Sequence, residues 1–274
     1  MPEKTLLKGL ALLEALSGSA KPRGVTDLAQ SLELSKTATH RLLQTLVSAG
    51  YVAKEESPGA YVLTTKAWQV GSAAIARMDA KTTGAKYLPA LADASRESVH
   101  IAILDGADVI YVEKIDSAHP LRTHSALGAR APAACVATGK ALLAHHSDEI
   151  VNKVAAGLRR HTPRSITTRA ALAKELEKVR RKGYAVNNGE WREDICSVAA
   201  PIFNAQRSVA AAIGISGPAY RIGRRLDDLG ILVARTAREI SRELGCASTA
   251  GVASGSSARD IPVTARDRRA GRAS

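Results

Sequence analysis

The pattern at residues 35–47 constrains the fold most, because it describes a helix whose two faces differ sharply in composition. Side chains suited to a core recur at the spacing i, i+3, i+4 and i+7. They are Thr39, Leu42, Leu43 and Leu46. The opposite face is polar and consists of Lys36, Thr37, His40, Arg41 and Gln44. No acidic residue occurs between Leu34 and Ala53, so we expect an amphipathic helix whose exposed face carries no negative charge.

A second helical pattern lies immediately before this helix. Its apolar positions are Val25, Leu28, Ala29 and Leu32. Only Glu33 and Leu34 separate it from Ser35, a favourable N-cap residue. Two helices joined by a tight turn, the second with an acid-free face, are typical of insertion into the DNA major groove. Phosphates line that groove and would repel a carboxylate. We therefore predict a helix-turn-helix.

The residues that follow predict a wing. Two short β-prone stretches, residues 51–53 and 60–63, flank the turn sequence Ser57-Pro58-Gly59. A hairpin directly after a recognition helix makes the unit a winged helix-turn-helix, which we assign to residues 1–64. Residues 65–80 are predicted to form a linker helix, which also offers a surface for dimer contact.

Residues 81–246 predict a second domain of mixed helices and strands. Two alternating strands, residues 99–104 and 109–115, flank Asp105-Gly106, a favoured hairpin dipeptide. Further strands are predicted at 184–186, 195–203 and 209–216, and helices at 87–95, 138–145, 147–156, 170–182 and 222–244. Helices mixed with hairpin-joined strands favour an α+β domain around an antiparallel sheet. Residues 247–274 are rich in Ser, Gly, Ala and Arg, which predicts a disordered basic tail.

Composition excludes several classes of protein. The three cysteines, Cys135, Cys196 and Cys246, form no CxxC pair, which argues against a disulfide framework and a zinc site. We expect no metal and no cofactor. No signal peptide and no apolar run of bilayer length is present, so we expect a cytoplasmic protein without membrane contact. The net charge of +13 favours polyanionic partners, but residues 1–66 hold eight Lys/Arg against six Asp/Glu, so charge contributes little to the DNA prediction.

Four stretches of the chain, in order, resemble the IclR family of bacterial transcriptional regulators. One runs from Leu32 to Val52 (LELSKTATHRLLQTLVSAGYV) and matches the family's recognition helix and wing. The other three are GARAPAACVATGKALLAH (128–145), GYAVNNGEWREDICSVAAPIF (183–203) and AAIGISGPAYRI (211–222). The resemblance covers nearly everything from Leu6 to Leu244.

This resemblance implies a winged helix-turn-helix joined to a GAF-like effector-binding domain, acting as a dimer or tetramer. It also implies control of a catabolic operon by a small organic acid. Together with the cap residue and the polar face, it gives the DNA-contacting set Ser35, Lys36, Thr37, Ala38, His40, Arg41 and Gln44. The effector-contacting positions that it implies are Gly128, Ala129, Asn187, Ile195, Cys196, Gly214 and Ser216. The chain departs from the family pattern where Ala38 replaces a frequent Thr, Asn187 stands where Asp can occur, and Gly214 where Ser can occur.

Two other functions are consistent with the sequence. Cys196 could act as a nucleophile in an enzyme that processes a small acid, but its apolar surroundings favour a structural thiol. The helix-turn-helix could instead bind a protein partner, as in a sensor or adaptor. We assign no catalytic residue and prefer the regulator, whose partners are operator DNA, the effector and a second copy of the chain.

Overall fold

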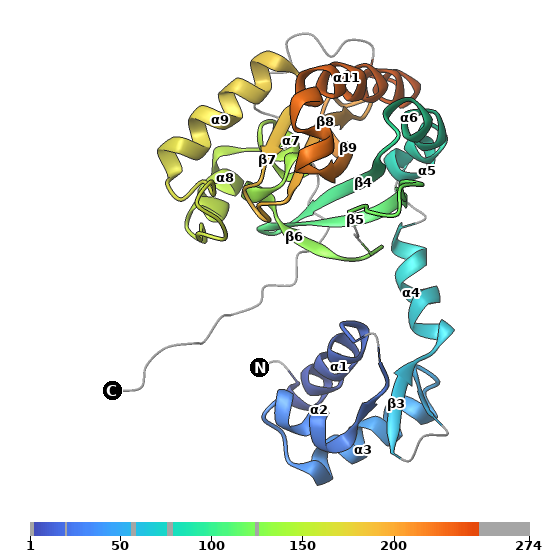
Figure 1. The fold of residues 1–274 in the computed structure, drawn as a ribbon. Helices are drawn as coiled ribbons and strands as arrows, with labels where there is room; N and C mark the ends of the chain where they lie inside the picture. The colour runs from blue at the N-terminus through green and yellow to red at the C-terminus, as the bar shows by residue number, and fades with distance from the viewer. Residues whose placement is uncertain (1–2, 20, 56–58, 76–78, 124–125, 247–274) are drawn as a thin grey trace. The chain divides into compact units, whose positions relative to one another are not determined.

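The computed structural model describes residues 3–19, 21–55, 59–75, 79–123 and 126–246 (Figure 1). The chain divides into two compact units, residues 1–77 and residues 78–274. Each unit has its own hydrophobic core.

The N-terminal unit combines helices with a small antiparallel sheet of order β1-β3-β2. Its elements are α1 (Lys4–Ser17), β1 (Arg23–Gly24), α2 (Val25–Ser31), α3 (Lys36–Ser48), β2 (Val52–Lys54), β3 (Ala60–Leu63) and α4 (Thr65–Ile75). The core consists of Leu12, Leu16, Leu28, Leu43, Val52 and Tyr61. Ser35 begins α3 as predicted, since its hydroxyl accepts a hydrogen bond from the Ala38 N–H at 3.2 Å.

This architecture confirms the winged helix-turn-helix. The structure adds β1, a strand of two residues that pairs with β3 and is too short to give a sequence pattern. Helix α4 falls within the N-terminal unit rather than apart from it. Of the predicted linker helix 65–80, residues 76–78 lie outside the described residues, and Asp79 and Ala80 begin a separate helix. Two residues of the predicted wing turn, Ser57 and Pro58, lie outside them too.

The C-terminal unit is built on a six-stranded antiparallel sheet of order β6-β5-β4-β9-β8-β7. Its strands are β4 (Ser98–Asp105), β5 (Asp108–Ile115), β6 (Arg130–Pro132), β7 (Ala185–Asn188), β8 (Ile195–Phe203) and β9 (Val209–Pro218). Its helices are α5 (Asp79–Ala85), α6 (Leu88–Ser95), η1 (Ala133–Cys135), α7 (Ala137–Leu143), α8 (Asp148–Ala155), α9 (Arg169–Lys182), α10 (Ala219–Ile222), η2 (Gly223–Arg225) and α11 (Leu226–Glu243).

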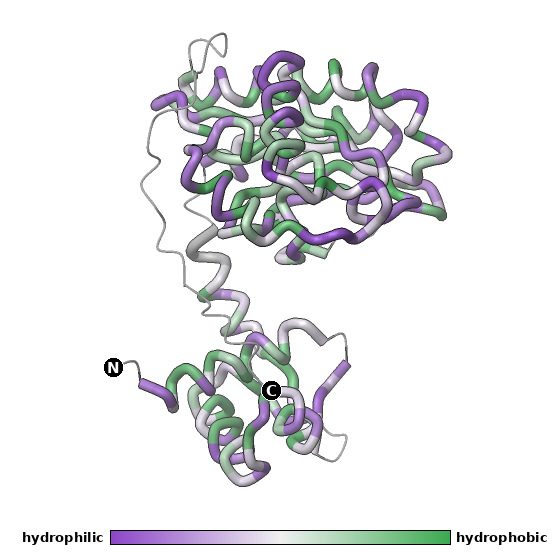
Figure 2. The backbone as a smooth tube through the Cα atoms, turned by 90° about the vertical axis from the view of Figure 1, so that its left-hand side faces the viewer, coloured by the Kyte–Doolittle hydropathy of each residue, from purple (hydrophilic) through white to green (hydrophobic). Residues whose placement is uncertain are grey.

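Helices cover both faces of this sheet (Figure 1). One core lies between the sheet and α7, α8 and α9, and the other lies between the sheet and α5, α6 and α11. Figure 2 shows hydrophilic and hydrophobic residues alternating along the outer helices, as expected for helices with one buried face. The central strands are consequently buried on both sides, and β8 is buried from Cys196 to Phe203.

The predicted α+β class and antiparallel sheet are confirmed, and the predicted strands agree with the observed ones within two residues at each end. The sequence patterns missed α5, β6 and the short turn helix α10, and they placed the start of α11 four residues early. The predicted tail, residues 247–274, lies outside the described residues. No helix in the described part of the chain is long and apolar enough to cross a membrane.

Candidate DNA-binding face and effector site

Helix α3 presents the predicted polar face to solvent. Six of the seven predicted DNA-contacting residues are exposed, namely Ser35, Lys36, Thr37, His40, Arg41 and Gln44. Ala38 is only half-buried, and Thr39 and Leu43 on the opposite side are fully buried. The two faces of the helix therefore have the orientation that the sequence predicted.

The charges on this face are free to meet phosphates. Within the described residues, neither Lys36 nor Arg41 has a carboxylate partner. Gln44 Nε2 lies 3.4 Å from the Tyr61 hydroxyl of β3 and 3.5 Å from His40 Nε2, so the wing strand supports this end of the face. Unpaired cations beside supported polar groups suit contact with a DNA backbone and base edges.

In the C-terminal unit, strand register places four polar side chains in one line across the sheet. Asn187 of β7 pairs with Ser197 of β8, Ser197 pairs with Ser216 of β9, and Ser216 pairs with Ser98 of β4. All four are buried, with exposures of 3–7%. We call these four residues the polar row. They lie on the sheet face that α7 covers, because side chains two apart on a strand share a face.

One hydrogen bond joins two members of the polar row, and the other two members bond to loop residues. Asn187 Nδ2 donates to Ser197 Oγ at 3.3 Å. The hydroxyls of Ser216 and Thr123 lie 2.8 Å apart, so Thr123 covers the row from the loop that follows β5. Buried hydroxyl and amide groups side by side can bind the oxygens of a small polar ligand.

A second line of residues runs beside the polar row. His100 of β4 pairs with Gly214 of β9, and a Cβ atom at Gly214 would lie only 2.9 Å from His100 Nε2. The ring of Tyr111 packs edge-on against His100, with centroids 4.9 Å apart. Burial lowers the pKa of His100 to about 4, so its imidazole is neutral at physiological pH. Burial also raises the pKa of Tyr111 to about 12.

The predicted residues Gly128 and Ala129 reach this area through the backbone. The Gly128 N–H donates to the Tyr111 carbonyl at 2.8 Å, and the Tyr111 N–H donates to the Ala129 carbonyl at 3.1 Å. Ile195 opens β8, two residues before Ser197, and is half-buried. The structure therefore brings Asn187, Gly214 and Ser216 together. It places Gly128, Ala129 and Ile195 around them.

Cys196 lies on the other face of the sheet. Its side chain belongs to the core under α11 with Val198 and Ala200, and its thiol donates to Asn188 Oδ1 at 3.3 Å. Burial raises the pKa of the thiol, which makes it a poor nucleophile. The sequence grouped Cys196 with Ser216, whereas the structure puts Ser197 in that place, one residue along the strand and on the opposite face.

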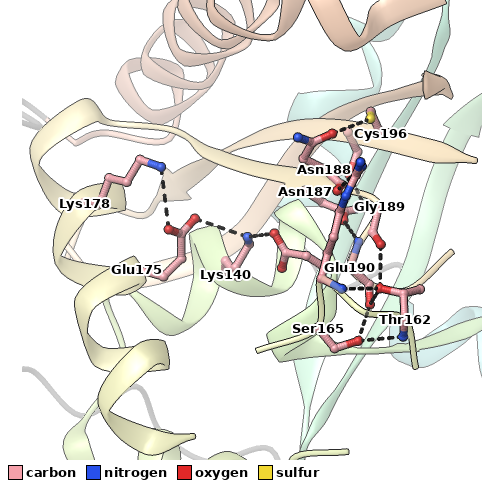
Figure 3. Close-up of polar contacts among 12 residues, drawn as sticks. Lys140, Thr162, Ser165, Glu175, Lys178, Asn187, Asn188, Gly189, Glu190 and Cys196 are labelled. Atoms are coloured by element: carbon pink, nitrogen blue, oxygen red, sulfur yellow. Dashed lines mark hydrogen bonds and ion pairs between the residues drawn. The ribbon is translucent and has the colours of Figure 1, made fainter. Parts of the chain in front are cut away.

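A buried ion pair holds the loop beside Asn187 (Figure 3). Lys140 of α7 has no exposed side-chain surface, and its Nζ lies 2.6 Å from Glu190 Oε1 and 3.2 Å from Glu175 Oε1. Thr162 Oγ1 donates to the Gly189 carbonyl at 2.7 Å, and Ser165 Oγ donates to the Glu190 carbonyl at 2.7 Å. These contacts join α7, the segment before α9 and the β7–β8 loop at one point.

Three further observations bear on ligands. A hollow of about 340 Å³ between α9 and the start of α11, lined in part by Lys178 and Asp227, lies away from the polar row. A smaller one of about 180 Å³ lies between α6 and α11. The described residues contain no group of three His, Cys, Asp or Glu side chains placed to hold a metal ion.

Comparison with known proteins identifies the family to which the two domains belong. The IclR helix-turn-helix domain matches residues 5–56, and the bacterial transcriptional regulator IclR C-terminal domain matches residues 72–242, more than half of the chain. The chain belongs to the IclR family of bacterial transcriptional regulators. The resemblance seen in the sequence and the predicted role as a DNA-binding regulator are thereby confirmed.

Relatives within the IclR family cover both units. The transcriptional regulator KdgR of Escherichia coli K12 is 34% identical over 244 residues, which cover 88% of this chain and 92% of KdgR. The transcriptional repressor AllR of Salmonella typhimurium is 34% identical over 248 residues, with 88% and 90% of the two chains covered.

Solved structures show the same IclR fold. The IclR of Thermotoga maritima has a TM-score of 0.72 at 27% identity, covering 88% of this chain and 98% of that one. An IclR homolog from Microbacterium hydrocarbonoxydans, solved in complex with 4-hydroxybenzoate, has a TM-score of 0.76 at 20% identity, covering 88% and 100%.

The residues that sequence reasoning missed are Ser98, Thr123 and Ser197, together with His100 as part of the site. The sequence could have indicated Ser98 and His100, because they are polar residues two apart at the start of a strand whose next four residues are apolar. No sequence pattern could have indicated Thr123, since it contacts Ser216 from a loop 93 residues away in sequence.

Proposed function

We propose that this IclR-family regulator binds operator DNA through α3 and is controlled by a small organic acid bound at the polar row. The observation that carries the proposal is the line of Asn187, Ser197 and Ser216, three buried hydrogen-bonding residues aligned by strand register. We further propose that the protein has no catalytic activity and acts in the cytoplasm, where bacterial operators lie.

The DNA contacts are assigned by exposure and charge. Lys36 and Arg41 neutralise phosphates, while Thr37, His40 and Gln44 face the base edges. Ser35 caps the helix, and Ala38 offers only a methyl group, which suits contact with thymine. A dimer or a tetramer would place two or more such helices on a near-palindromic operator.

An acid is supported as the ligand class by the charges around the polar row. Asn187 replaces the Asp that can occur at this position, which removes a negative charge that would repel a carboxylate. The hydroxyls of Ser197 and Ser216 can each donate a hydrogen bond to a ligand oxygen, and the neutral His100 can donate or accept one. The 4-hydroxybenzoate complex of the Microbacterium homolog supports an acid of this kind.

Control requires that the acid bind one arrangement of the regulator more tightly than another. We propose that α4, which follows the wing directly, passes this preference to the DNA-binding unit. Whether the acid releases or recruits the regulator depends on which arrangement fits the operator.

Selection of genomic fragments by the purified protein tests the DNA proposal, and release or capture of the selected fragment by a panel of organic acids tests the effector proposal. Removing the Ser216 hydroxyl, in Ser216→Ala, should raise the acid concentration for half-response about tenfold, as for one lost hydrogen bond to a charged group. Ser241→Ala changes a buried serine of α11, is the matched control and should leave the response unchanged. Equal responses of Ser216→Ala and wild type to every acid would refute the placement.

A further inference from the structure

The buried pair of Lys140 and Glu190 is costly to form, because both charges must leave water. The Lys140 side chain is fully buried and that of Glu190 is 12% exposed. Glu190 Oε2 is buried and has no hydrogen-bond partner in the described structure. Burial raises the pKa of Glu190, and the charge of Lys140 opposes that shift. Buried ion pairs are poor sources of stability, so what this pair holds in place matters more than the free energy it contributes.

The backbone of Glu190 leads directly to the polar row. Its N–H donates to Asn187 Oδ1 at 2.8 Å. Its carbonyl is held by Ser165, and its side chain is held by Lys140 (Figure 3). Glu190 is therefore fixed at three points, and one of its hydrogen bonds ends on the effector-site amide.

This hydrogen bond sets which way the Asn187 amide points. An N–H group can donate only to the amide oxygen, so Oδ1 must face Glu190 and Nδ2 must face Ser197. The Nδ2 group has two hydrogens, and its bond to Ser197 uses one of them. Asn187 thus brings N–H groups, and not its acceptor oxygen, to the polar row.

We propose that Lys140 and Glu190 are positioning residues that lock the Asn187 amide with its N–H groups toward the effector, so that the site selects a ligand with an unprotonated oxygen at this point. The inference rests on the polar row being the effector site. It predicts that the ion pair acts on ligand affinity through Asn187 alone.

A double-mutant cycle tests this route, with benzoate, 4-hydroxybenzoate and pyruvate as probes and the full chain as the sample. Lys140→Met leaves Glu190 without its cation, while Glu175 keeps Lys178, so we expect about tenfold weaker binding of the tightest probe. In an Asn187→Ala background, Lys140→Met should weaken binding no further. Equal weakening in both backgrounds would mean that the pair only stabilises the fold, and would overturn the inference.

Three more variants sharpen the test. Lys140→Met combined with Glu190→Gln removes both charges of the pair, a replacement that buried pairs commonly tolerate, and it serves if Lys140→Met alone does not fold. It should give the same loss of affinity. Lys86→Met breaks another ion pair of the same unit, with Glu243 at 2.7 Å, and should change nothing. Asn187→Asp, which replaces the N–H groups by an anionic oxygen, should abolish binding of all three carboxylates.

A readout without ligand separates this inference from the proposed effector. The side-chain amide signal of Asn187 in a ¹⁵N–¹H spectrum is identified by its loss in Asn187→Ala. Its hydrogens should exchange with water at least tenfold faster in Lys140→Met than in wild type. Unchanged exchange overturns the inference, even where a probe binds. If no probe binds the wild type, the small-acid proposal fails for these acids, while faster exchange in Lys140→Met still supports the positioning role.

Discussion

Replacing Arg41 by alanine should make DNA binding less sensitive to salt. Arg41 is exposed on α3 and has no carboxylate partner in the described structure, so its full charge is available to a phosphate. Each phosphate that a cation neutralises contributes about 0.9 to the slope of log K against log salt. A dimer carries two copies of Arg41, so Arg41→Ala should reduce that slope by about 1.8.

The size of the effect follows from the same relation. When salt rises from roughly 50 to 200 mM, each phosphate contact weakens binding by a factor of about 3.5. A variant that lacks one contact is spared that factor. For two contacts, wild-type affinity should fall about twelvefold more over this range than that of Arg41→Ala. Lower affinity of the variant at low salt should appear with operator DNA and with unrelated DNA alike, because phosphates carry no sequence information.

The assay is fluorescence anisotropy of labelled duplexes, operator and unrelated, at four or more salt concentrations. Lys8→Ala is the control, since Lys8 is an exposed cation of the same unit on α1 and has no ion-pair partner among the described residues. It removes the same charge away from α3. If Arg41→Ala kept the wild-type slope, or if Lys8→Ala reduced it equally, α3 would not be the docking helix.

Three further outcomes are expected. Leu43→Ala removes a side chain with no exposed surface from the N-terminal core, so urea unfolding should show that unit destabilised by about 2–5 kcal/mol. Glu33 has a left-handed backbone, with φ 53, in the turn before α3. Because glycine adopts this conformation without the Cβ clash, Glu33→Gly should stabilise the same unit by about 1 kcal/mol. A lower urea midpoint would contradict this. Because burial lowers the pKa of His100 from 6.5 to about 4, the unfolded chain binds its proton first as pH falls. Stability should therefore drop by about 1.4 kcal/mol per pH unit from this group between those values, and His100→Asn should remove that part of the pH dependence.

Local patterns carried the sequence predictions that the structure confirms. The 3.6-residue period of Thr39 and Leu43 fixes which face of α3 is buried, and the polar face follows from it without knowledge of any other element. Hairpin signals such as Asp105-Gly106 likewise join neighbouring segments. Elements of two or three residues, such as β1 and β6, have no period to detect and were missed.

The composition of the candidate effector site depended on the tertiary structure. In β8 both faces are covered by helices, so Cys196, Ser197 and Val198 are all buried and no alternation of polar and apolar residues tells their faces apart. Only pairing with β9 shows that Ser197, and not Cys196, lies beside Ser216. The sequence therefore determined that a recognition helix exists and which face it exposes, because that information is local. Strand register across distant segments decided which residues form the polar row, our candidate effector site, because a shift of one residue moves every side chain to the other face of the sheet.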